Sequence, residues 1–260
     1  MNRTKIDWAD YTWNPVTGCY KGCPYCYAAK IANRFGLNFA PKLGDYGMEG
    51  AGKFDSTQEG MDTMLEINKP YKDYCGKKNS FPMAFAPTFH RYRLEEPQHV
   101  KKASTIFVCS MADLFGDWVP NVWINTVLEA CEKAPWHRYL FLTKNSKRYR
   151  DITFSDNMWY GATITGAGFE RSNEYLSRSG NRSFLSIEPL LGSFAARDMW
   201  RHLGWVIIGA ETGNRKGKVI PEREWIEYIV EHCSNASVPV FMKESLRKIW
   251  GEQLIQEYPW

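Results

Sequence analysis

Short apolar runs that end in polar residues recur along most of the chain. After the first eighty residues they cover 83–86, 105–109, 139–142, 159–163, 184–187, 205–208 and 238–242. Runs of this length and character are typical of strands buried on both faces of a parallel sheet. Stretches that suit helices lie between several of them, at 119–133, 169–178 and 221–233. The pattern predicts an α/β fold in which strands and helices alternate.

The N-terminal part adds one strand, one helix and an irregular segment. Residues 8–17 are aromatic and β-prone and predict the first strand, and the alanine-rich stretch 27–35 predicts a helix that ends before Gly36. Residues 36–80 show no convincing periodic apolar pattern, apart from a short expected helix at 58–67. We interpret 36–80 as an insertion, either a functional cover or a plain surface excursion. About eight strands then predict a complete or partial (β/α) barrel, as a single domain over 1–260.

Composition places the chain among globular proteins and limits its compartment. Of its 260 residues 44% are hydrophobic, which is ample for a core. The N-terminus shows no apolar signal segment, and no run approaches the roughly 18 apolar residues of a membrane span. We therefore expect a soluble cytoplasmic protein with no membrane association, whose seven cysteines stay reduced and free for metal. The net charge of +4 permits a nucleic-acid partner without arguing for one.

Three of the cysteines are closely spaced on one glycine-containing stretch. Cys19, Cys23 and Cys26 follow the pattern C-x3-C-x2-C. Three thiolates can hold a 4Fe-4S cluster and leave one iron open for an exchangeable ligand, whereas an electron-transfer cluster normally has four thiolates. The alternative is structural zinc, which needs a fourth ligand, and the other cysteines are single and widely separated. The spacing favours the cluster and leaves zinc open.

The same stretch resembles the signature of radical S-adenosylmethionine (SAM) enzymes, with Tyr25 in the aromatic slot before the third cysteine. The resemblance implies a barrel of the radical SAM type, in which the open iron chelates SAM and the adenine lies near Tyr25. It also implies a reducing partner of the flavodoxin or ferredoxin type, whose electron lets the enzyme cleave SAM to a radical that abstracts hydrogen from the substrate. The stretches FVCSMADLFG, FLTKN, FLSIEPLLG and IIGAETG further resemble a phage-associated three-cysteine family related to these enzymes.

One motif of that superfamily is absent. Many radical SAM enzymes carry Gly-Gly-Glu after the second strand to hold the SAM amino group, and Pro87-Thr88 occupies the corresponding place in the predicted strand count. We expect Ser110, Asp113 or Thr88 to supply the missing contact.

Polar residues follow most of the predicted strands, where a (β/α) barrel builds its active site. For SAM binding, besides Tyr25, we predict Ser110, Asp113, Thr143, Thr163 and Ser186. For catalysis we predict Glu188, Glu211 and Lys243, which are expected to face one cavity above the cluster. A lysine beside two carboxylates keeps them ionised and suits proton movement. A structural salt-bridge network at the barrel mouth is the competing interpretation.

Two basic segments bear on the substrate. Residues 144–150 and 90–93 interleave arginine and lysine with tyrosine, a mixture that can bind phosphates and stack bases, although solvated helix faces look similar. The sequence thus favours a radical SAM enzyme that abstracts hydrogen from a nucleotide or nucleic acid. The alternative is a non-catalytic zinc- or iron-sulfur-containing nucleic-acid-binding protein.

Overall fold

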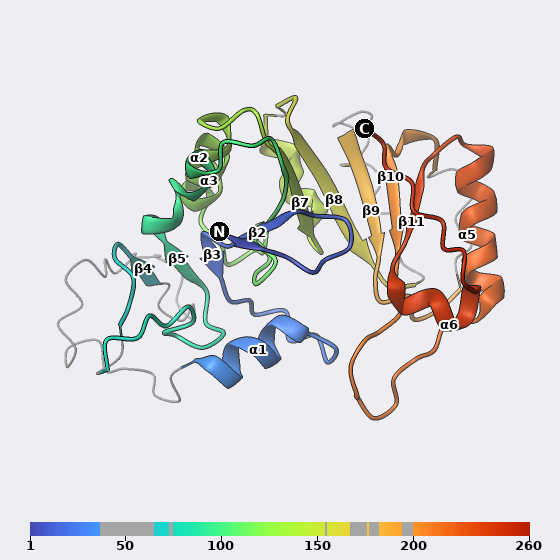
Figure 1. The fold of residues 1–260 in the computed structure, drawn as a ribbon, viewed down its shortest axis with the longest axis horizontal. Coiled ribbons are helices and arrows are strands. Elements are labelled where there is room, and N and C mark those ends of the chain that lie inside the picture. Colours follow the sequence, from blue (N-terminus) through green and yellow to red (C-terminus); the bar gives the residue numbers. More distant parts are fainter. Residues whose placement is uncertain (37–64, 73–74, 154, 167–175, 177–181, 194–199) are drawn as a thin grey trace. The chain divides into compact units, whose positions relative to one another are not determined.

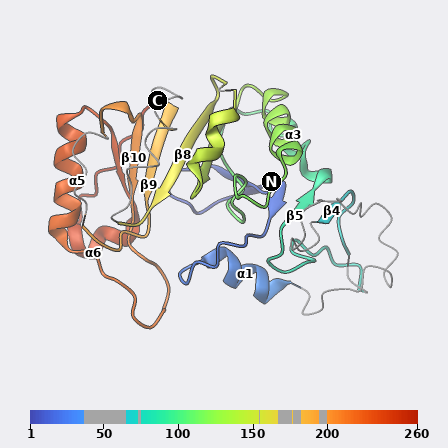
Figure 2. The same ribbon diagram turned by 180° about the vertical axis from the view of Figure 1, so that it is seen from behind.

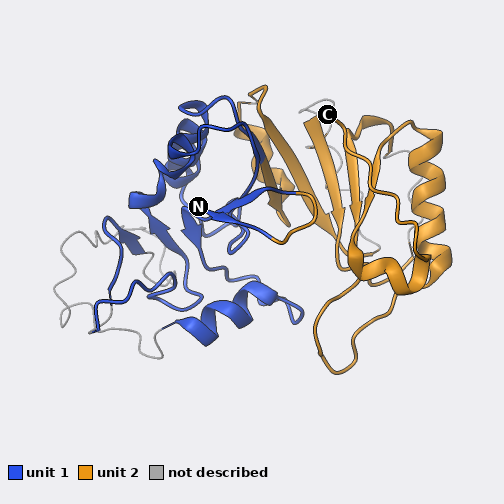
Figure 3. Cartoon of the chain, in the orientation of Figure 1, with its two compact units in different colours: residues 1–4, 9–139 blue, residues 5–8, 140–260 orange. Residues whose placement is uncertain are grey.

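A computed structural model describes residues 1–36, 65–72, 75–153, 155–166, 176, 182–193 and 200–260. The chain is mixed α/β and divides into two compact units (Figure 3). Unit 1 comprises residues 1–4 and 9–139, and unit 2 comprises residues 5–8 and 140–260. A single domain over 1–260 remains a prediction, and most of the predicted insertion at 36–80 lies outside the described residues.

Unit 1 contains strands of two sheets. In the first, β1 (Asn2–Arg3) runs antiparallel to β2 (Tyr11–Trp13), and β2 runs parallel to β6 (Thr105–Val108). In the second, β5 (Thr88–His90) pairs antiparallel with β3 (Val16–Thr17) and parallel with β4 (Leu65–Ile67) (Figure 1). The helices of this unit are α1 (Tyr27–Phe35), the 3-10 helix η1 (Arg91–Arg93), α2 (Glu96–His99) and α3 (Asn121–Glu132).

Unit 2 contains a parallel sheet. The unit boundary falls inside β7 (Arg138–Thr143), and the order then continues with β8 (Met158–Ile164), β9 (Ser183–Ile187), β10 (Trp205–Ile208) and β11 (Val240–Met242). The strands from β8 to β11 pair in parallel. The helices are η2 (Ser146–Asp151), η4 (Trp200–His202), α5 (Arg223–Asn235), η5 (Glu244–Leu246) and α6 (Arg247–Trp250); α5 lies beside the sheet in both views (Figures 1 and 2).

The register of unit 2 brings three strand ends to one level. Ile208 at the end of β10 is the partner of Ile187 in β9 and of Met242 in β11. The residues that follow these three therefore emerge side by side at the carboxyl edge of the sheet. All residues of β9, β10 and β11 are buried, which explains why these runs are nearly continuous in apolar residues.

Aromatic side chains form much of the core of unit 2. The ring of Trp205 contacts those of Trp8, Phe241, Tyr258 and Trp260 at centroid distances between 5.1 and 6.2 Å. Its indole nitrogen donates a hydrogen bond of 2.9 Å to the Glu257 carbonyl. Trp8, Trp205 and Phe241 are buried in this core, and Tyr258 and Trp260 pack against it while remaining exposed.

Most of the predicted elements are present. The helix at 27–35 is confirmed with its bounds, and the runs near 105, 139, 159, 184, 205 and 238 are strands. The helices predicted at 119–133 and 221–233 correspond to α3 and α5. The helix predicted at 169–178 lies outside the described residues except for position 176.

Three predictions at the N-terminal end are wrong. Residues 83–86 form turns, and the strand nearby is β5, which belongs to the small sheet. Residues 8–17 form two short strands of different sheets, interrupted around Pro15. The end of the helix predicted at 58–67 is strand β4, and residues 58–64 lie outside the described residues.

Closure of the strands into a complete barrel remains a prediction. Within the described ranges, no helix has the length and apolar character needed to cross a membrane.

Candidate functional site

The cysteine loop joins β3 to α1 and orients two of its thiols through backbone amides. Cys26 is the N-cap of α1, and its Sγ accepts a hydrogen bond of 3.4 Å from the Ala29 amide. The Cys19 Sγ accepts one of 3.4 Å from the Lys21 amide. The Cys26 amide donates to the Cys23 carbonyl at 3.0 Å and so tightens the loop. Amide hydrogen bonds to sulfur are among the contacts by which proteins tune iron-sulfur clusters.

Gly18 allows the loop to pack directly against neighbouring backbone. Its φ of +87° is in the left-handed region, and a Cβ there would lie 2.2 Å from the Ala86 carbonyl oxygen. The Gly18 amide donates to the Met111 carbonyl at 2.9 Å, and the Cys19 amide donates to the Phe85 carbonyl at 3.1 Å. A residue with a side chain does not fit this position, because the obstacle is main chain and cannot rotate away.

The three thiols have the chemistry of cluster ligands. All three are half-buried and none is in a disulfide. Burial raises the pKa of the Cys19 thiol to about 11, and the nearby Asp113, Cys23 and Cys26 act in the same direction. Within the described residues, no three His, Cys, Asp or Glu side chains are already arranged to hold a metal. The donors fit a three-thiolate cluster, whose binding would displace the thiol protons and draw the sulfurs together.

The segment after β6 lies against the cysteine loop. Asn14 Oδ1 accepts hydrogen bonds from the Met111 amide at 2.9 Å and from Ser110 Oγ at 3.2 Å. The Tyr27 hydroxyl donates to the Ser110 carbonyl at 2.7 Å, and Gly18 forms a parallel bridge with Ala112. The sequence analysis did not identify Asn14 or Tyr27 as site residues. Tyr27 could have been recognised because it directly follows the third cysteine of the loop.

This arrangement corrects the position assigned to the missing Gly-Gly-Glu contact. β6 is the parallel neighbour of β2, so the segment after the second parallel strand contains Ser110 and Asp113 and not Pro87-Thr88. Thr88 lies buried in β5, where its hydroxyl donates to the Ala86 carbonyl at 2.9 Å. Asp113 is buried, and its Oδ1 accepts from the Phe115 amide at 3.2 Å. Tyr25 is half-buried on the loop itself.

In unit 2 the structure brings Glu188 and Lys243 together as an ion pair. Glu188 follows β9 and Lys243 follows β11, so the strand between them must leave room for the contact. Gly209 follows that strand, β10, and a Cβ built on it would lie 3.1 Å from Lys243 Cδ and 3.2 Å from the Glu188 side chain. The glycine therefore lets the two side chains meet above the end of the middle strand.

Glu211 pairs with a residue that the sequence analysis missed. Its two carboxylate oxygens accept hydrogen bonds of 2.6 and 2.8 Å from Arg215 Nε and Nη2. The hydrogen bonds from Arg215 hold the pKa of the buried Glu211 carboxyl below its ordinary value. In place of one lysine beside two carboxylates, the structure has two ion pairs, Glu188 with Lys243 and Glu211 with Arg215. That Glu188, Glu211 and Lys243 face one cavity above the cluster remains a prediction. The spacing of four residues between Glu211 and Arg215 was no signal for their pairing, because residues 211–215 are not helical.

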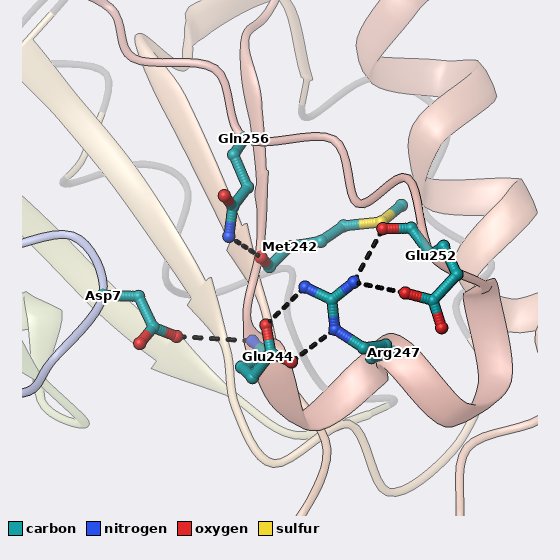
Figure 4. Close-up of polar contacts among 6 residues, drawn as sticks. All are labelled: Asp7, Met242, Glu244, Arg247, Glu252 and Gln256. Carbon is teal, nitrogen blue, oxygen red and sulfur yellow. Dashed lines mark hydrogen bonds and ion pairs between the residues drawn. The ribbon is translucent and has the colours of Figure 1, made fainter.

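The chain after Lys243 forms a corner held by charged residues (Figure 4). The Arg247 guanidinium pairs with the Glu244 carboxylate, with Nη2 to Oε2 at 2.8 Å, and its Nη1 donates to the Glu252 carbonyl at 2.7 Å. Asp7 Oδ2 accepts from the Glu244 amide at 3.3 Å. These contacts secure the turn from β11 into α6 and thereby the start of that turn at Lys243.

The three remaining predicted SAM contacts are on other strands of unit 2. Thr163 in β8 and Ser186 in β9 are partners in the register, and Ser186 is fully buried within its strand. Thr143, the last residue of β7, is buried and its Oγ1 accepts from the Asn145 amide at 2.9 Å. Their roles in SAM binding remain predictions.

The basic segment 90–93 has a structural role in unit 1. His90 is buried, and its Nε2 lies 2.8 Å from the Thr17 hydroxyl. Arg93 donates to the carbonyls of Asn14 at 2.8 Å and Ser80 at 3.1 Å, and Arg91 pairs with a glutamate of β4. These contacts give the segment a structural role within unit 1, and phosphate binding by it remains a prediction.

Comparisons with known proteins agree with the fold. A family model described as "Protein of unknown function (DUF5131)" matches residues 3–257. A solved spore photoproduct lyase mutant with bound AdoMet and dinucleoside spore photoproduct is similar, with a TM-score of 0.51 at 8% identity. The match covers 96% of this chain and 76% of that chain. Another spore photoproduct lyase mutant matches over the same shares, with a TM-score of 0.46 at 10% identity.

At such low identity the first likeness shows a shared fold. A search of the curated proteins gives no match. The resemblance to a phage-associated family remains a prediction.

Proposed function

This chain belongs to the DUF5131 family, and we propose that it is a radical SAM enzyme that acts on a nucleotide or nucleic acid. Cys19, Cys23 and Cys26 would hold a 4Fe-4S cluster. When bound, that cluster would supply an open iron for SAM and the electron that cleaves it. The fold shared with spore photoproduct lyase supports an enzyme of the radical SAM type.

The packing of the cysteine loop against the segment after β6 is the observation that carries the proposal. The amides of Gly18 and Cys19 and the hydroxyl of Tyr27 join the loop to neighbouring backbone. Ser110, whose hydroxyl donates to Asn14 Oδ1, and Asp113, whose carboxylate acts electrostatically on the Cys19 thiol, are the residues after β6 that we propose for SAM. A carboxylate in this place can accept hydrogen bonds from an ammonium group, which is the contact that SAM requires. Tyr25, half-buried on the same loop, would stack on the adenine.

The Glu188–Lys243 pair is the proposed proton-handling group for the substrate. Both side chains are partly accessible, at 26% and 18%, so a substrate can reach them. A carboxylate next to an ammonium group can accept or return a proton as charge develops on a bound molecule. Glu211, with both oxygens engaged by Arg215, is proposed to act by holding the loop after β10 in place.

That loop supports a phosphate-containing substrate. The Lys218 amide donates to the Arg215 carbonyl at 3.2 Å, and Gly217 between them has a φ of +74°, which defines a tight turn. The turn exposes Lys216 and Lys218 to solvent. The ion pair between Glu211 and Arg215 holds the base of this turn, and the two exposed lysines on it are the cations that we propose contact phosphate.

Anaerobic reconstitution tests the proposed cofactor. Wild-type protein should bind about four irons and, once reduced, cleave SAM, as a cluster with three protein thiolates predicts. Alanine at any one of the three cysteines should abolish the cluster. Cys75→Ser is the matched control, because Cys75 is exposed and lies outside the loop.

Full iron content in a variant that lacks all three loop cysteines would refute the cluster assignment. Stoichiometric zinc in the protein as isolated, with no SAM cleavage after reconstitution, would favour the binding-protein alternative. The substrate class is tested separately by the affinity for single-stranded DNA and RNA oligonucleotides. Lys216→Ala combined with Lys218→Ala should weaken that affinity and flatten its salt dependence. Lys102→Ala with Lys133→Ala removes two exposed lysines elsewhere as the control.

A further inference from the structure

Helix α1 carries its large apolar side chains on the outside and its small ones on the inside. Ala28 and Ala32 are its buried residues and pack into the core of unit 1. Tyr27, Ile31 and Phe35, spaced four residues apart, are 50%, 38% and 59% exposed. A surface helix normally turns its large apolar side chains toward the core. We call these three residues the α1 stripe, and an outward apolar row of this kind marks a contact with another molecule.

The charged residues that flank the α1 stripe in the sequence are basic. Lys21, Lys30 and Arg34 are all exposed, and the sequence contains no aspartate or glutamate from position 11 to position 44. The Arg34 guanidinium lies 5.3 Å from the centroid of the Phe35 ring, so a cation borders the apolar row directly. An apolar centre with a charged rim is the usual anatomy of a protein–protein interface. The charge of this rim favours an acidic partner.

The α1 stripe also begins at the cysteine loop. Cys26 caps α1, and Tyr27 is the next residue. A helix of nine residues is about 13 Å long, so the whole α1 stripe lies within roughly that distance of a cluster ligand along the helix axis. A partner that docks here is therefore next to the group that the loop would hold.

We propose that the α1 stripe and its basic rim form the docking surface for an acidic one-electron carrier protein. This inference rests on the proposed function, in which the cluster takes up one electron from outside the protein. The carrier would donate that electron and leave oxidised by one electron, and no bond is formed or broken. Small, electrostatically steered interfaces are typical of such transient redox encounters.

Two other occupants fit less well. A second copy of this chain would bring two basic rims together, which is repulsive. A nucleic acid would complement the cations, but its phosphate backbone would leave Ile31 and Phe35 without an apolar partner. Both alternatives are outcomes of the experiments below.

The direct test is binding of oxidised flavodoxin, as an acidic carrier, to the reconstituted protein by titration calorimetry. Ile31→Ala combined with Phe35→Ala should weaken binding by about tenfold or more, as loss of central apolar contacts does. Tyr27 is left intact because its hydroxyl supports the site. Val122→Ala with Ile220→Ala is the matched control, since both side chains are exposed apolar groups outside α1, and it should bind like wild type.

Charge reversal and kinetics give two further readouts. Lys30→Glu combined with Arg34→Glu should lower the affinity, and the wild-type affinity should fall as salt rises. Reduced flavodoxin should reduce the cluster of the Ile31/Phe35 variant more slowly than that of wild type. Dithionite, a small reductant that needs no docking surface, should reduce both clusters at the same rate.

Several results would overturn the docking surface. One such result is an unchanged flavodoxin affinity in both the Ile31/Phe35 and the Lys30/Arg34 double variants. Another is that dithionite reduces the cluster of the Ile31/Phe35 variant as slowly as flavodoxin does, because α1 would then act only by supporting the cysteine loop. If wild-type protein is a dimer in light scattering and the double variants are monomers, the surface binds a second copy of this chain. If the double variants lose oligonucleotide binding and keep flavodoxin binding, the surface binds nucleic acid. A wild-type protein that binds flavodoxin but cannot cleave SAM with any reductant refutes the proposed function and leaves the docking surface in place.

Discussion

Replacing Gly18 by alanine should be far more damaging than the same change at Gly22, although both glycines are in the cysteine loop. Their φ angles are +87° and +65°, so alanine in either position costs about 1 to 2 kcal/mol of backbone strain. At Gly22 the new methyl group meets nothing within 4 Å. At Gly18 it would lie 2.2 Å from the Ala86 carbonyl oxygen, and 2.7 Å from the Phe85 carbonyl oxygen.

The clash at Gly18 must be relieved by moving the backbone. That movement breaks the hydrogen bonds from the Gly18 and Cys19 amides, which are 2.9 and 3.1 Å long. Each such bond contributes about 1 kcal/mol to stability. Gly18→Ala should therefore lower the free energy of unfolding by about 2 kcal/mol more than Gly22→Ala does. For a chain of this size the difference corresponds to a melting temperature about 4 to 8 °C lower.

Thermal unfolding of the two apo variants followed by circular dichroism measures this difference, and iron content after reconstitution measures its effect on the site. Gly22→Ala should retain most of the iron, and Gly18→Ala should lose most of it. Equal melting temperatures for the two variants, or normal iron content in Gly18→Ala, would refute the argument that the loop is positioned by its contact with the backbone at 85–86.

Glu211→Gln should destabilise the protein at neutral pH, and urea unfolding should show the difference from wild type shrinking below about pH 4. The folded-state pKa of Glu211 is below its unfolded value. Its contribution to the free energy of unfolding is therefore present above the unfolded pKa and is lost as pH falls through the folded pKa. A difference between the variant and wild type that grows in acid would contradict this. Burial raises the pKa of Cys109 and Cys233 to about 12, so iodoacetamide at pH 8 should label the exposed Cys75 in native protein and reach these two only after unfolding, as peptide mass spectrometry can show. Tyr25→Ala should weaken SAM binding to the reconstituted protein by about tenfold, given about 1 to 3 kcal/mol for stacking on a base, and an unchanged affinity in titration calorimetry would place the adenine elsewhere.

Local patterns in the sequence were sufficient to predict most of the helices and strands. Helix α1 was predicted with its bounds because alanine and basic residues favour a helix between the cysteine loop and Gly36. The strands from β6 to β11 were recognisable because their residues are buried on both faces, and so are apolar without alternation. The register of parallel strands then placed Glu188 and Lys243 on one edge, as expected from positions that directly follow strands.

Pairing between distant segments was not readable in the same way. β5 is as fully buried as β6, yet it belongs to the small sheet, and an apolar run does not record which strand it pairs with. The predicted strand at 83–86 failed for a related reason. Those residues form turns whose carbonyls meet the cysteine loop, and that contact is selected by packing and not by local propensity.

The sequence by itself determined the chemistry that this protein can offer: three thiols on one short loop, an aromatic residue beside them, and charged residues after buried strands. Spacing along a covalent chain limits how far apart such groups can lie, so this part needs no tertiary information. Only the tertiary structure decided which partner each group has. Arg215 neutralises Glu211, Ser110 and Asp113 lie beside the loop, and α1 turns its apolar side chains outward. These choices depend on contacts between residues far apart in sequence, whose energies are set by packing and burial.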